Sequence, residues 1–357
     1  MNYTYVATIG FFDGVHVGHR YLISKVCEMA RTRGLRSMVI TFDRHPREVL
    51  QADYRPQLLT TPSVKEALLR QTGVDHVEVL HFTRELAALS AREFMDSVLR
   101  QKLHVCRLVI GYDHRFGHNR AEGFDDYVRY GRELGIEVIR NNEMKLQFRP
   151  VDSSAAPDAH THDAAAAAPA LAAHMHVSST TIRRLLSDGH VDMAALVLNR
   201  HYTLLGHVAH GFAEGRKMGF PTANLDTTGY PLLMPAAGVY AVAVRVCSDD
   251  SQLDESCDAS PITVTLDELP SVSRLAEGWM PAMLNIGTRP TFGGGATTVE
   301  AHILNFCGDI YGRPMAVAFY AKIRDEHRFD SIVALERQLA ADRDAVQRHF
   351  AMFGMGK

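Results

Sequence analysis

The sequence lacks several features that would place the chain in a specialised class. Its five cysteines, in 357 residues, include no CxxC pair, which argues against a disulfide framework and a thiolate zinc site. Lysine and arginine total 38 against 41 for aspartate and glutamate, a formal net charge of −3, without the basic excess of nucleic-acid-binding proteins. These absences favour a protein of the reducing cytoplasm with no nucleic-acid partner.

The sequence also has no long hydrophobic run, and its first residues do not show the pattern of a signal peptide. The first residues, MNYTYVATIGFFDG, contain neither a basic n-region nor an apolar h-region. The longest apolar run, residues 164–173, is well short of the ~20 residues that a membrane-spanning helix needs. We therefore expect a soluble, unexported chain with no membrane partner. With 46% hydrophobic residues it can bury two cores, and its length predicts about two domains.

The first half of the chain alternates strands with helices. A capping box is expected where Ser90 is followed by Glu93. This alternation predicts an α/β fold with a parallel sheet, right-handed crossovers and helices on both faces. The expected strands are 3–9, 35–42, 76–82, 105–111 and 136–139, and the expected helices are 18–33, 63–71, one opened by Ser90, and 124–134.

From residue 202 onward, strands separated by glycine and proline predict a small antiparallel barrel or sandwich. The last strand alternates apolar and polar residues, as a half-buried strand does, and an amphipathic helix is expected at 331–350. The expected strands are 202–211, 238–246, 283–287, 299–306 and 315–324. We predict two domains, residues 1–188 and residues 201–357, joined by a linker helix at residues 189–200.

Two segments interrupt this organisation. Residues 152–174 are alanine-rich, with prolines and histidines but no period, and predict a mobile loop whose histidines are solvated rather than metal ligands. Residues 247–279 are polar and acidic and predict a surface excursion. Before the strand-rich half, SSTTIRRLLSDG and DMAALVL predict two short helices, capped by Ser179 or Thr180 and by Asp192.

The string GFFDGVHVGHRYLI follows the first strand and opens the first helix. In a doubly wound sheet this place favours anions, because backbone N–H groups and the helix dipole point there. His16 and His19 would project to one side of the first turn and donate hydrogen bonds to phosphate, and Gly18 would let a phosphate approach the backbone. The alternative is a loop with incidental histidines.

In this context HxGH resembles the nucleotidylyltransferase superfamily. The resemblance implies a second phosphate-binding cluster, which SSTTIRR would supply through Ser179, Thr180 and a bidentate Arg183. Taken alone, that string is only a helix cap. A third string, GYDHRFG, carries Asp113, whose carboxylate would either orient a ligand or cap its own turn.

The strand-rich half holds another group of polar residues. Glycines recur every four residues at 211, 215 and 219, which lets backbone approach a ligand closely. Thr222 and Asn224 face the same way on an extended chain and could share a hard cation such as Mg²⁺. Glu300, which shares a strand face with His302, would be a general base for an attacking alcohol or an exposed edge residue.

Both groups on one chain resemble the bacterial bifunctional riboflavin kinase/FAD synthetase family. The matching strings are GFFDGVHVGH, GYDHRFG, SSTTIR, GRKMGFPTANL, PAAGVYAV, NIGTRPTFGG, TVEAHILNF and IRDEHRF, in order from residue 10 to residue 329. The resemblance implies a Rossmann-like FMN adenylyltransferase domain followed by an antiparallel β-barrel riboflavin kinase domain with a C-terminal helix. It also implies conversion of riboflavin to FMN and then to FAD, with ATP as co-substrate and Mg²⁺ as cofactor.

The same resemblance assigns residues to roles. His114 stands where the family more often has phenylalanine, and segments 152–174 and 247–279 look like insertions. The assigned residues are Glu300, His16 and His19 for catalysis; Gly10, Phe11, Gly18, Ser179, Thr180, Arg183, Gly215 and Gly219 for the nucleotide; Asp113, Phe116 and Arg324 for the flavin; and Thr222 and Asn224 for the metal.

Three alternatives remain open from the sequence. The chain could retain only one of the two activities, or it could be a nonenzymatic flavin-binding protein. HxGH also occurs in class I aminoacyl-tRNA synthetases, but the near-neutral charge and the absence of a KMSKS-like string disfavour that reading.

Overall fold

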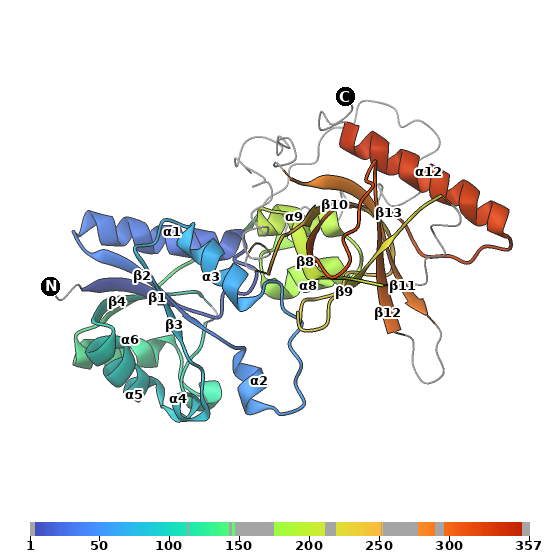
Figure 1. Ribbon diagram of the computed structural model, residues 1–357. Coiled ribbons are helices and arrows are strands. Elements are labelled where there is room, and N and C mark those ends of the chain that lie inside the picture. Colours follow the sequence, from blue (N-terminus) through green and yellow to red (C-terminus); the bar gives the residue numbers. More distant parts are fainter. Residues whose placement is uncertain are drawn as a thin grey trace.

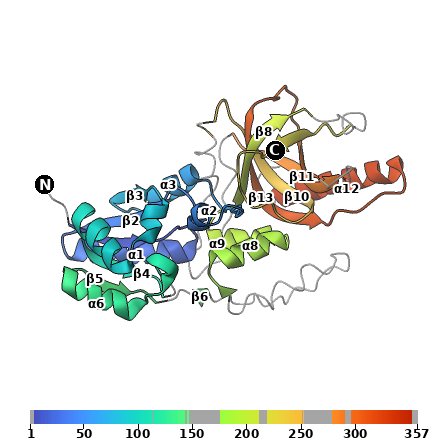
Figure 2. The same ribbon diagram turned by 90° about the horizontal axis from the view of Figure 1, so that it is seen from below.

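The computed structural model describes most of the chain. An α/β region and a β-barrel lie side by side, with helices α8 (Ser179–Ser187) and α9 (Val191–Leu198) between them (Figures 1 and 2). Among the described residues, no helix is long and apolar enough to cross a membrane. The described residues are 4–112, 114–142, 145–146, 175–210, 219–250, 252, 278–289 and 296–351.

Five parallel strands form the sheet of the α/β region, in the order β3-β2-β1-β4-β5. The central strand β1 is flanked by β2 and β4, so the chain reverses its direction of winding between β1 and β4. Ligands of open α/β sheets bind at such a switch point. The predicted parallel sheet is confirmed. Its strands are β1 (Tyr5–Ile9), β2 (Arg36–Phe42), β3 (His76–Leu80), β4 (Val105–Ile110) and β5 (Glu137–Arg140).

Helices of the α/β region begin and end close to the predicted residues. The helix expected at 124–134 is α6 (Phe124–Leu134), which ends at Gly135 in the left-handed conformation. The Ser90–Glu93 capping box is present at the start of α5. Two five-residue helices, α2 and α4, were not predicted, because they are too short to show a helical period. The helices are α1 (Val17–Thr32), α2 (Pro46–Leu50), α3 (Pro62–Arg70), α4 (Arg84–Ala88), α5 (Ala91–Glu93) with the π-helix η1 (Phe94–Lys102), η2 (His118–Arg120) and α6.

Six strands close into the antiparallel barrel, in the order β10-β11-β12-β9-β8-β13. Closure leaves none of these strands at a sheet edge, and it confirms the barrel alternative. Strand β9, which the sequence analysis did not count, has only four residues after Pro221 and Thr222. The strands are β8 (Tyr202–Ala209), β9 (Ala223–Asp226), β10 (Gly238–Val246), β11 (Met280–Arg289), β12 (Ala296–Ile303) and β13 (Pro314–Arg324).

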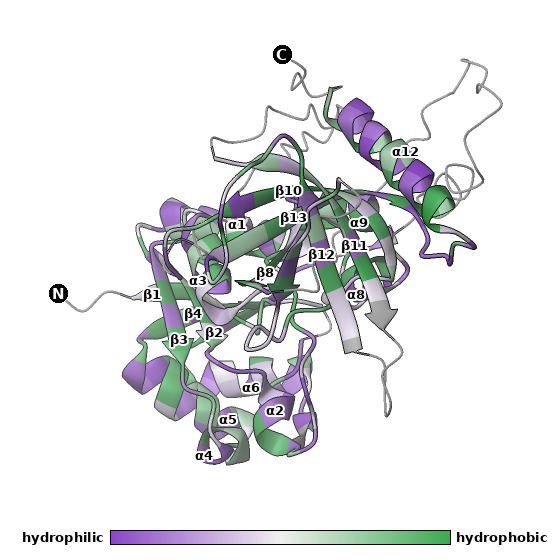
Figure 3. Ribbon diagram, turned by 45° about the vertical axis from the view of Figure 1, so that its right-hand side comes forward, coloured by the Kyte–Doolittle hydropathy of each residue, from purple (hydrophilic) through white to green (hydrophobic). Residues whose placement is uncertain are grey.

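The burial of β13 corrects one expectation. The strand was predicted to be half-buried, but residues 314–320 are buried on both faces. Its outward side is covered by other elements. Tyr320 stacks on His201 with 3.7 Å between ring centres, and Phe350 of the C-terminal helix α12 (Ile332–Ala351) lies edge-on to it at 5.0 Å. Figure 3 shows α12 lying across the barrel, with an apolar stretch at its N-terminal end.

Helices α8 and α9 do not have the predicted caps. The N-cap of α8 is Ser178, whose hydroxyl accepts a hydrogen bond from the N–H of Thr181 at 3.1 Å, so Ser179 and Thr180 lie in the first turn. The residue before α9 is His190 rather than Asp192.

The short strands β6 (Lys145–Leu146) and β7 (Met175–His176) pair just before α8, and Ser178 is the last extended residue after them. Segment 152–174 and most of 247–279 lie outside the described residues.

The two regions contact each other through backbone and side-chain hydrogen bonds. The N–H of Leu58 donates to the carbonyl of Pro231, and its carbonyl accepts from the N–H of Leu233, both at 2.8 Å. The buried side chain of Arg200 donates from Nη1 to the carbonyl of Gly14, also at 2.8 Å. The loop that follows β1 is therefore attached directly to the chain that enters the barrel.

Candidate functional site

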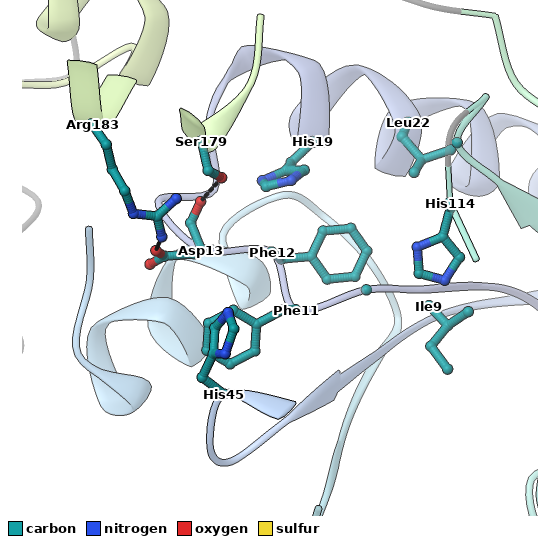
Figure 4. Close-up of a pocket in the computed structure, with 12 residues that line it drawn as sticks. Ile9, Phe11, Phe12, Asp13, His19, Leu22, His45, His114, Ser179 and Arg183 are labelled. Carbon is teal, nitrogen blue, oxygen red and sulfur yellow. Dashed lines mark hydrogen bonds and ion pairs between the residues drawn. The ribbon is translucent and has the colours of Figure 1, made fainter. Parts of the chain in front are cut away.

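A pocket of about 290 Å³ lies at the switch point of the parallel sheet, where β1 and β4 end. Figure 4 shows its side chains converging from the loop after β1, from α1 and from α8. Five of the residues assigned to nucleotide binding or catalysis line this pocket: Gly10, Phe11, His19, Ser179 and Arg183. The structure thus brings His19 of HxGH together with Ser179 and Arg183 of SSTTIRR.

The loop between β1 and α1 has an unusual backbone. Phe12 and Val15 both have positive φ angles, of 54° and 40°. Gly10 makes room for the Phe12 ring, because a Cβ at residue 10 would lie 3.0 Å from Phe12 Cζ. The Phe12 ring in turn packs edge-on against His19, with 5.1 Å between ring centres. Such strained backbone persists only where the surrounding structure holds it, and it is common at functional sites.

His16 and His19 stack on each other at the N-terminus of α1, with 3.6 Å between ring centres. His16 Nδ1 accepts a hydrogen bond from the N–H of His19 at 3.3 Å, which caps the helix. Burial, reinforced by the positive charges of Arg200 and Arg183, lowers the pKa of His16 to about 3. Burial also lowers the pKa of His19 well below 6.5. Both imidazoles are therefore neutral at pH 7.

His19 carries a buried polar atom that lacks a partner. Its Nδ1 makes no hydrogen bond within the described part of the chain, although buried nitrogens in folded proteins are nearly always paired. The residue lines the pocket at a helix N-terminus, where backbone N–H groups and the helix dipole attract anions. This combination fits a polar, negatively charged ligand.

Asp13 joins the segments that form the pocket. Its buried carboxylate accepts hydrogen bonds from the N–H groups of Leu59 at 3.0 Å and Thr60 at 3.2 Å, and it forms an ion pair with Arg183. Its carbonyl accepts from the Ser179 hydroxyl at 2.9 Å. Burial raises the pKa of Asp13, and Arg183 and the N–H donors oppose that shift. The position of Arg183 in the pocket thus depends on Asp13 and on the carbonyl of Gln57, to which Arg183 Nε donates at 2.8 Å.

A second cation lies behind the pocket wall. Lys65 is buried, with Nζ 3.9 Å from the centre of the Phe11 ring and 2.7 Å from the carbonyl oxygen of Phe42 to which it donates. Burial lowers the pKa of Lys65 to about 8. His45 also contacts the Phe11 ring, edge-on, with 4.8 Å between ring centres. Burial and the positive charge of Arg183 lower the pKa of His45 to about 4. Lys65 and Arg183 therefore place positive charge around a pocket in which His19 and His45 are neutral.

Sequence reasoning missed three residues of this site. Asp13 lies inside the quoted string GFFDGVHVGH, but nothing local shows that its carboxylate faces Arg183. His45 follows the second predicted strand and could have been found by the rule that ligands bind beyond the carboxyl ends of strands. Lys65 sits on the buried face of α3, and no local signal distinguishes it from a solvated lysine.

Several residues assigned to the nucleotide lie outside the pocket. Thr180 is exposed on the first turn of α8. A Cβ at Gly18 would lie 3.1 Å from Val177 Cγ1, so the missing side chain lets α1 pack against the chain before α8. Gly219 has a left-handed φ of 80°, with open space around it, and it is needed for its backbone conformation. Gly215 lies outside the described residues.

The residues assigned to the flavin are placed as follows. Phe116 stacks on Tyr127 with 4.2 Å between ring centres, within the core of the α/β region. Arg324 donates from Nε and Nη2 to the carboxylate of Asp342 at 2.8 to 3.0 Å and so joins β13 to α12. Asp113 lies outside the described residues. His114, close to it in the chain, lines the pocket.

The residues assigned to the kinase lie together on the outer face of the barrel. Strand register pairs Glu300 with Asn224 of β9 and with Asn285 of β11. Their chain neighbours Ala301 and Leu225 belong to the barrel core, so Glu300 and Asn224 point outward. Glu300 is half-buried on a strand paired on both sides, which excludes the edge-strand alternative.

The oxygen atoms near Glu300 suit a hard cation. Thr222 precedes β9 and is two residues from Asn224, so alternation along the chain directs it to the same outer face. Hydroxyl, amide and carboxylate oxygens are the ligands that Mg²⁺ prefers, and Mg²⁺ usually completes its shell with substrate phosphates and water. The described residues contain no group of three or more His, Cys, Asp or Glu that could hold a metal, so protein ligands here would be few.

Comparisons with known proteins cover both halves of the chain. A family model described as FAD synthetase matches residues 1–155, and one described as riboflavin kinase matches residues 198–350. The chain is 32% identical over 347 residues to the bifunctional riboflavin kinase/FMN adenylyltransferase of Escherichia coli (strain K12), covering 97% of this chain and 93% of the relative. The chain belongs to this bifunctional family.

A further relative and a solved structure are also similar over nearly the whole chain. The bifunctional riboflavin kinase/FMN adenylyltransferase of Pseudomonas fluorescens is 33% identical over 344 residues, with 94% of this chain and 90% of the relative covered. A crystal structure from Streptococcus pneumoniae, described as a macrolide-efflux protein, has a TM-score of 0.73 and 28% sequence identity, and it covers 97% of this chain and 95% of its own. The two-domain arrangement is therefore shared over nearly the whole chain.

Proposed function

We propose that this member of the family carries out both reactions, phosphorylating riboflavin to FMN with ATP and then adenylylating FMN to FAD. The observation that carries the proposal is the presence of two separate polar sites, one in the α/β region and one on the barrel. One is the pocket where Asp13 and Ser179 fasten α8 to the HxGH loop. The other is the outer barrel face where Glu300 and Asn224 are register partners.

In the adenylyl transfer, a phosphate oxygen of FMN attacks the α-phosphorus of ATP. The bond from that phosphorus to the bridging oxygen breaks, and pyrophosphate leaves. The FMN phosphate is already a nucleophile, so no general base is required. His16 is buried and is not among the residues that line the pocket. Its Nδ1 accepts from a backbone N–H, so its proton is on Nε2 and would be available to a phosphate bound at the start of α1. His16, His19, Arg183 and the N-terminus of α1 would stabilise the charge that develops.

In the kinase reaction, the Glu300 carboxylate takes the proton of the ribityl 5′-hydroxyl while that oxygen attacks the γ-phosphorus of ATP. The bond to the β-phosphate oxygen breaks and ADP leaves. Thr222 and Asn224 would hold Mg²⁺, which neutralises phosphate charge when bound. The support for these roles is the shared outer face of β9 and β12.

We also propose that the protein works in the cytoplasm, where ATP is abundant and thiols stay reduced. The four described cysteines, Cys27, Cys106, Cys247 and Cys307, are all free. Free thiols are the usual state in a reducing compartment.

Product analysis tests the proposal. The purified chain is incubated with riboflavin, ATP and Mg²⁺, and separately with FMN, ATP and Mg²⁺, and the products are separated by chromatography. We expect FMN followed by FAD in the first reaction, and FAD with pyrophosphate in the second. A single product would leave only one of the activities. No product in either reaction would contradict both and favour a flavin-binding protein.

A further inference from the structure

We propose that His302 is a positioning residue of the kinase site, which holds the Pro221 carbonyl and thereby sets Thr222 on the barrel face that carries Asn224 and Glu300. This inference rests on the proposed kinase function and deepens it. The observation behind it is a hydrogen bond between His302 Nδ1 and the carbonyl oxygen of Pro221, at 2.9 Å. These two residues are 81 positions apart in the chain, so the bond joins β12 to the segment that leads into β9.

The backbone alone does not hold this segment. Pairing between β9 and β12 consists of Glu300 with Asn224 and Ala301 with Ala223, and it stops there. Proline has no N–H and cannot extend a ladder as a donor. His302 is the residue of β12 that follows Ala301, the last residue paired with β9. Its side chain, in place of a backbone hydrogen bond, therefore joins β12 to the segment before β9. Thr222 therefore lies between a residue held by strand pairing and a carbonyl held by His302.

The hydrogen bond also fixes which nitrogen carries the proton. A carbonyl oxygen only accepts, so Nδ1 of His302 is the protonated nitrogen. The ring is held from a second side by Phe220, which packs against it edge-on with 5.3 Å between ring centres. Arg343 of α12 lies 5.9 Å from the centre of the Phe220 ring. The imidazole thus has a defined place among β12, the start of β9 and α12.

Loss of this hydrogen bond should affect Thr222 more than its neighbours. Asn224 and Glu300 would keep their strand pairing, while the peptide group at Pro221 would lose its partner. Thr222 would then be free to move relative to Asn224, which would weaken binding of the nucleotide and its cation. The general base would remain in place, so we expect the change in KM for MgATP rather than in kcat.

Two substitutions of similar size separate the hydrogen bond from packing. In His302→Asn, the side-chain amide nitrogen takes a position close to that of Nδ1 and can still donate. His302→Leu removes the donor and keeps apolar volume. Riboflavin kinase rates are measured over a range of MgATP and of Mg²⁺ concentrations, with FMN adenylylation of the same samples as a control in the distant site.

We expect His302→Leu to raise the KM for MgATP about three- to tenfold, the worth of a typical hydrogen bond, with kcat changed by less than about twofold. His302→Asn should stay within about twofold of wild type, and adenylylation should be unchanged in both. A His302→Leu enzyme with wild-type KM, or a His302→Asn enzyme as impaired as His302→Leu, would overturn the inference.

Two controls keep the outcome interpretable. The single tryptophan, Trp279, is buried in the barrel region, so its fluorescence reports whether each variant is folded. If His302→Leu does not fold, His302→Gln replaces it. The amide nitrogen of glutamine lies farther along the side chain than Nδ1 of histidine, so this substitution should raise KM as His302→Leu does.

A wild-type chain that makes no FMN would overturn the proposed kinase function and this inference with it. An active wild type with insensitive variants would overturn only the inference.

Discussion

The pocket of the α/β region and the outer face of the barrel position their residues by different means. In the pocket, Asp13 and Arg183 are 170 positions apart and meet through an ion pair whose carboxylate is buried and whose guanidinium is partly exposed. On the barrel, Asn224 and Glu300 are brought together by the register of adjacent strands. The pocket therefore depends mainly on the Asp13 side chain, whereas strand pairing sets Asn224 and Glu300 on the barrel and only Thr222 relies on a side chain, that of His302. A substitution at the pocket should disturb structure and chemistry together, while one at Glu300 should disturb chemistry alone.

The largest effect is expected for Glu300→Gln, which keeps the shape of the side chain and removes the base. We expect riboflavin kinase turnover to fall about 10²- to 10⁴-fold, the usual worth of general base catalysis. FMN adenylylation and the free energy of unfolding should stay close to wild type. Initial rates of FMN formation from riboflavin and of FAD formation from FMN, measured separately, test this prediction. Equal loss of both activities would contradict the separation of the two sites.

Asp13→Asn tests the opposite case, because it breaks the ion pair that holds α8. Arg183, whose side chain is partly exposed, would lose its counter-charge, and a hydrogen bond to a charged group contributes about 1.5–3 kcal/mol. We expect a lower free energy of unfolding, measured by guanidinium titration with circular dichroism, and loss of FMN adenylylation.

The matched control is Asp13→Asn combined with Arg183→Met, which removes both charges. If the ion pair carries the effect, the double variant should be more stable than Asp13→Asn alone. Adenylylation should stay low in the double variant, since Arg183 lines the pocket. A single Asp13→Asn variant with wild-type stability and wild-type adenylylation would show that Asp13 does not organise this site.

Acidification should destabilise the α/β region more than the barrel. His16 has a folded pKa of about 3 against an ordinary value of 6.5, so between these pH values the unfolded chain binds a proton that the folded chain does not. Stability is then full above pH 6.5 and falls below it, by about 1.4 kcal/mol per pH unit for a fully buried histidine. His19 and His45 shift in the same direction, while in the barrel region His201 has a folded pKa of about 4.

Guanidinium unfolding at pH 7.0 and pH 5.5 measures this difference. Circular dichroism follows the whole chain, and Trp279 fluorescence follows the barrel. We expect the midpoint from circular dichroism to fall at pH 5.5 by more than the midpoint from fluorescence. Equal midpoints at the two pH values would mean that the histidines are protonated in the folded protein.

The smallest effect is expected at the contact between the two regions. Arg200→Met removes the donor to the Gly14 carbonyl, and a buried carbonyl left without its partner costs about 1–3 kcal/mol. We expect a lower midpoint of thermal unfolding, with both activities retained at 25 °C. Selective loss of adenylylation at that temperature would show that Arg200 also shapes the loop after β1.

Local sequence features predicted the elements of both regions, but not how distant residues meet. The parallel sheet, α6 and the Ser90 cap followed from periodicity and capping residues, which act over a few positions. The meeting of His19, Ser179 and Arg183 was implied by the resemblance to the nucleotidylyltransferase superfamily, because the string SSTTIRR taken alone predicts only a helix cap. Asp13 could not be recognised, since its partners are 46 and 170 positions away. The buried outer face of β13 depends on α12, which no pattern within the strand reveals.

A mixing experiment tests the central claim, two independent sites on one chain, most directly. Glu300→Gln should lack the kinase and keep adenylylation, and His19→Ala should do the reverse. Riboflavin, ATP and Mg²⁺ are given to each variant alone and to an equal mixture, and FAD is measured by chromatography. We predict FAD from the mixture but from neither variant alone, with FMN accumulating in the His19→Ala reaction. FAD formed by either variant alone, or none from the mixture, would contradict the account.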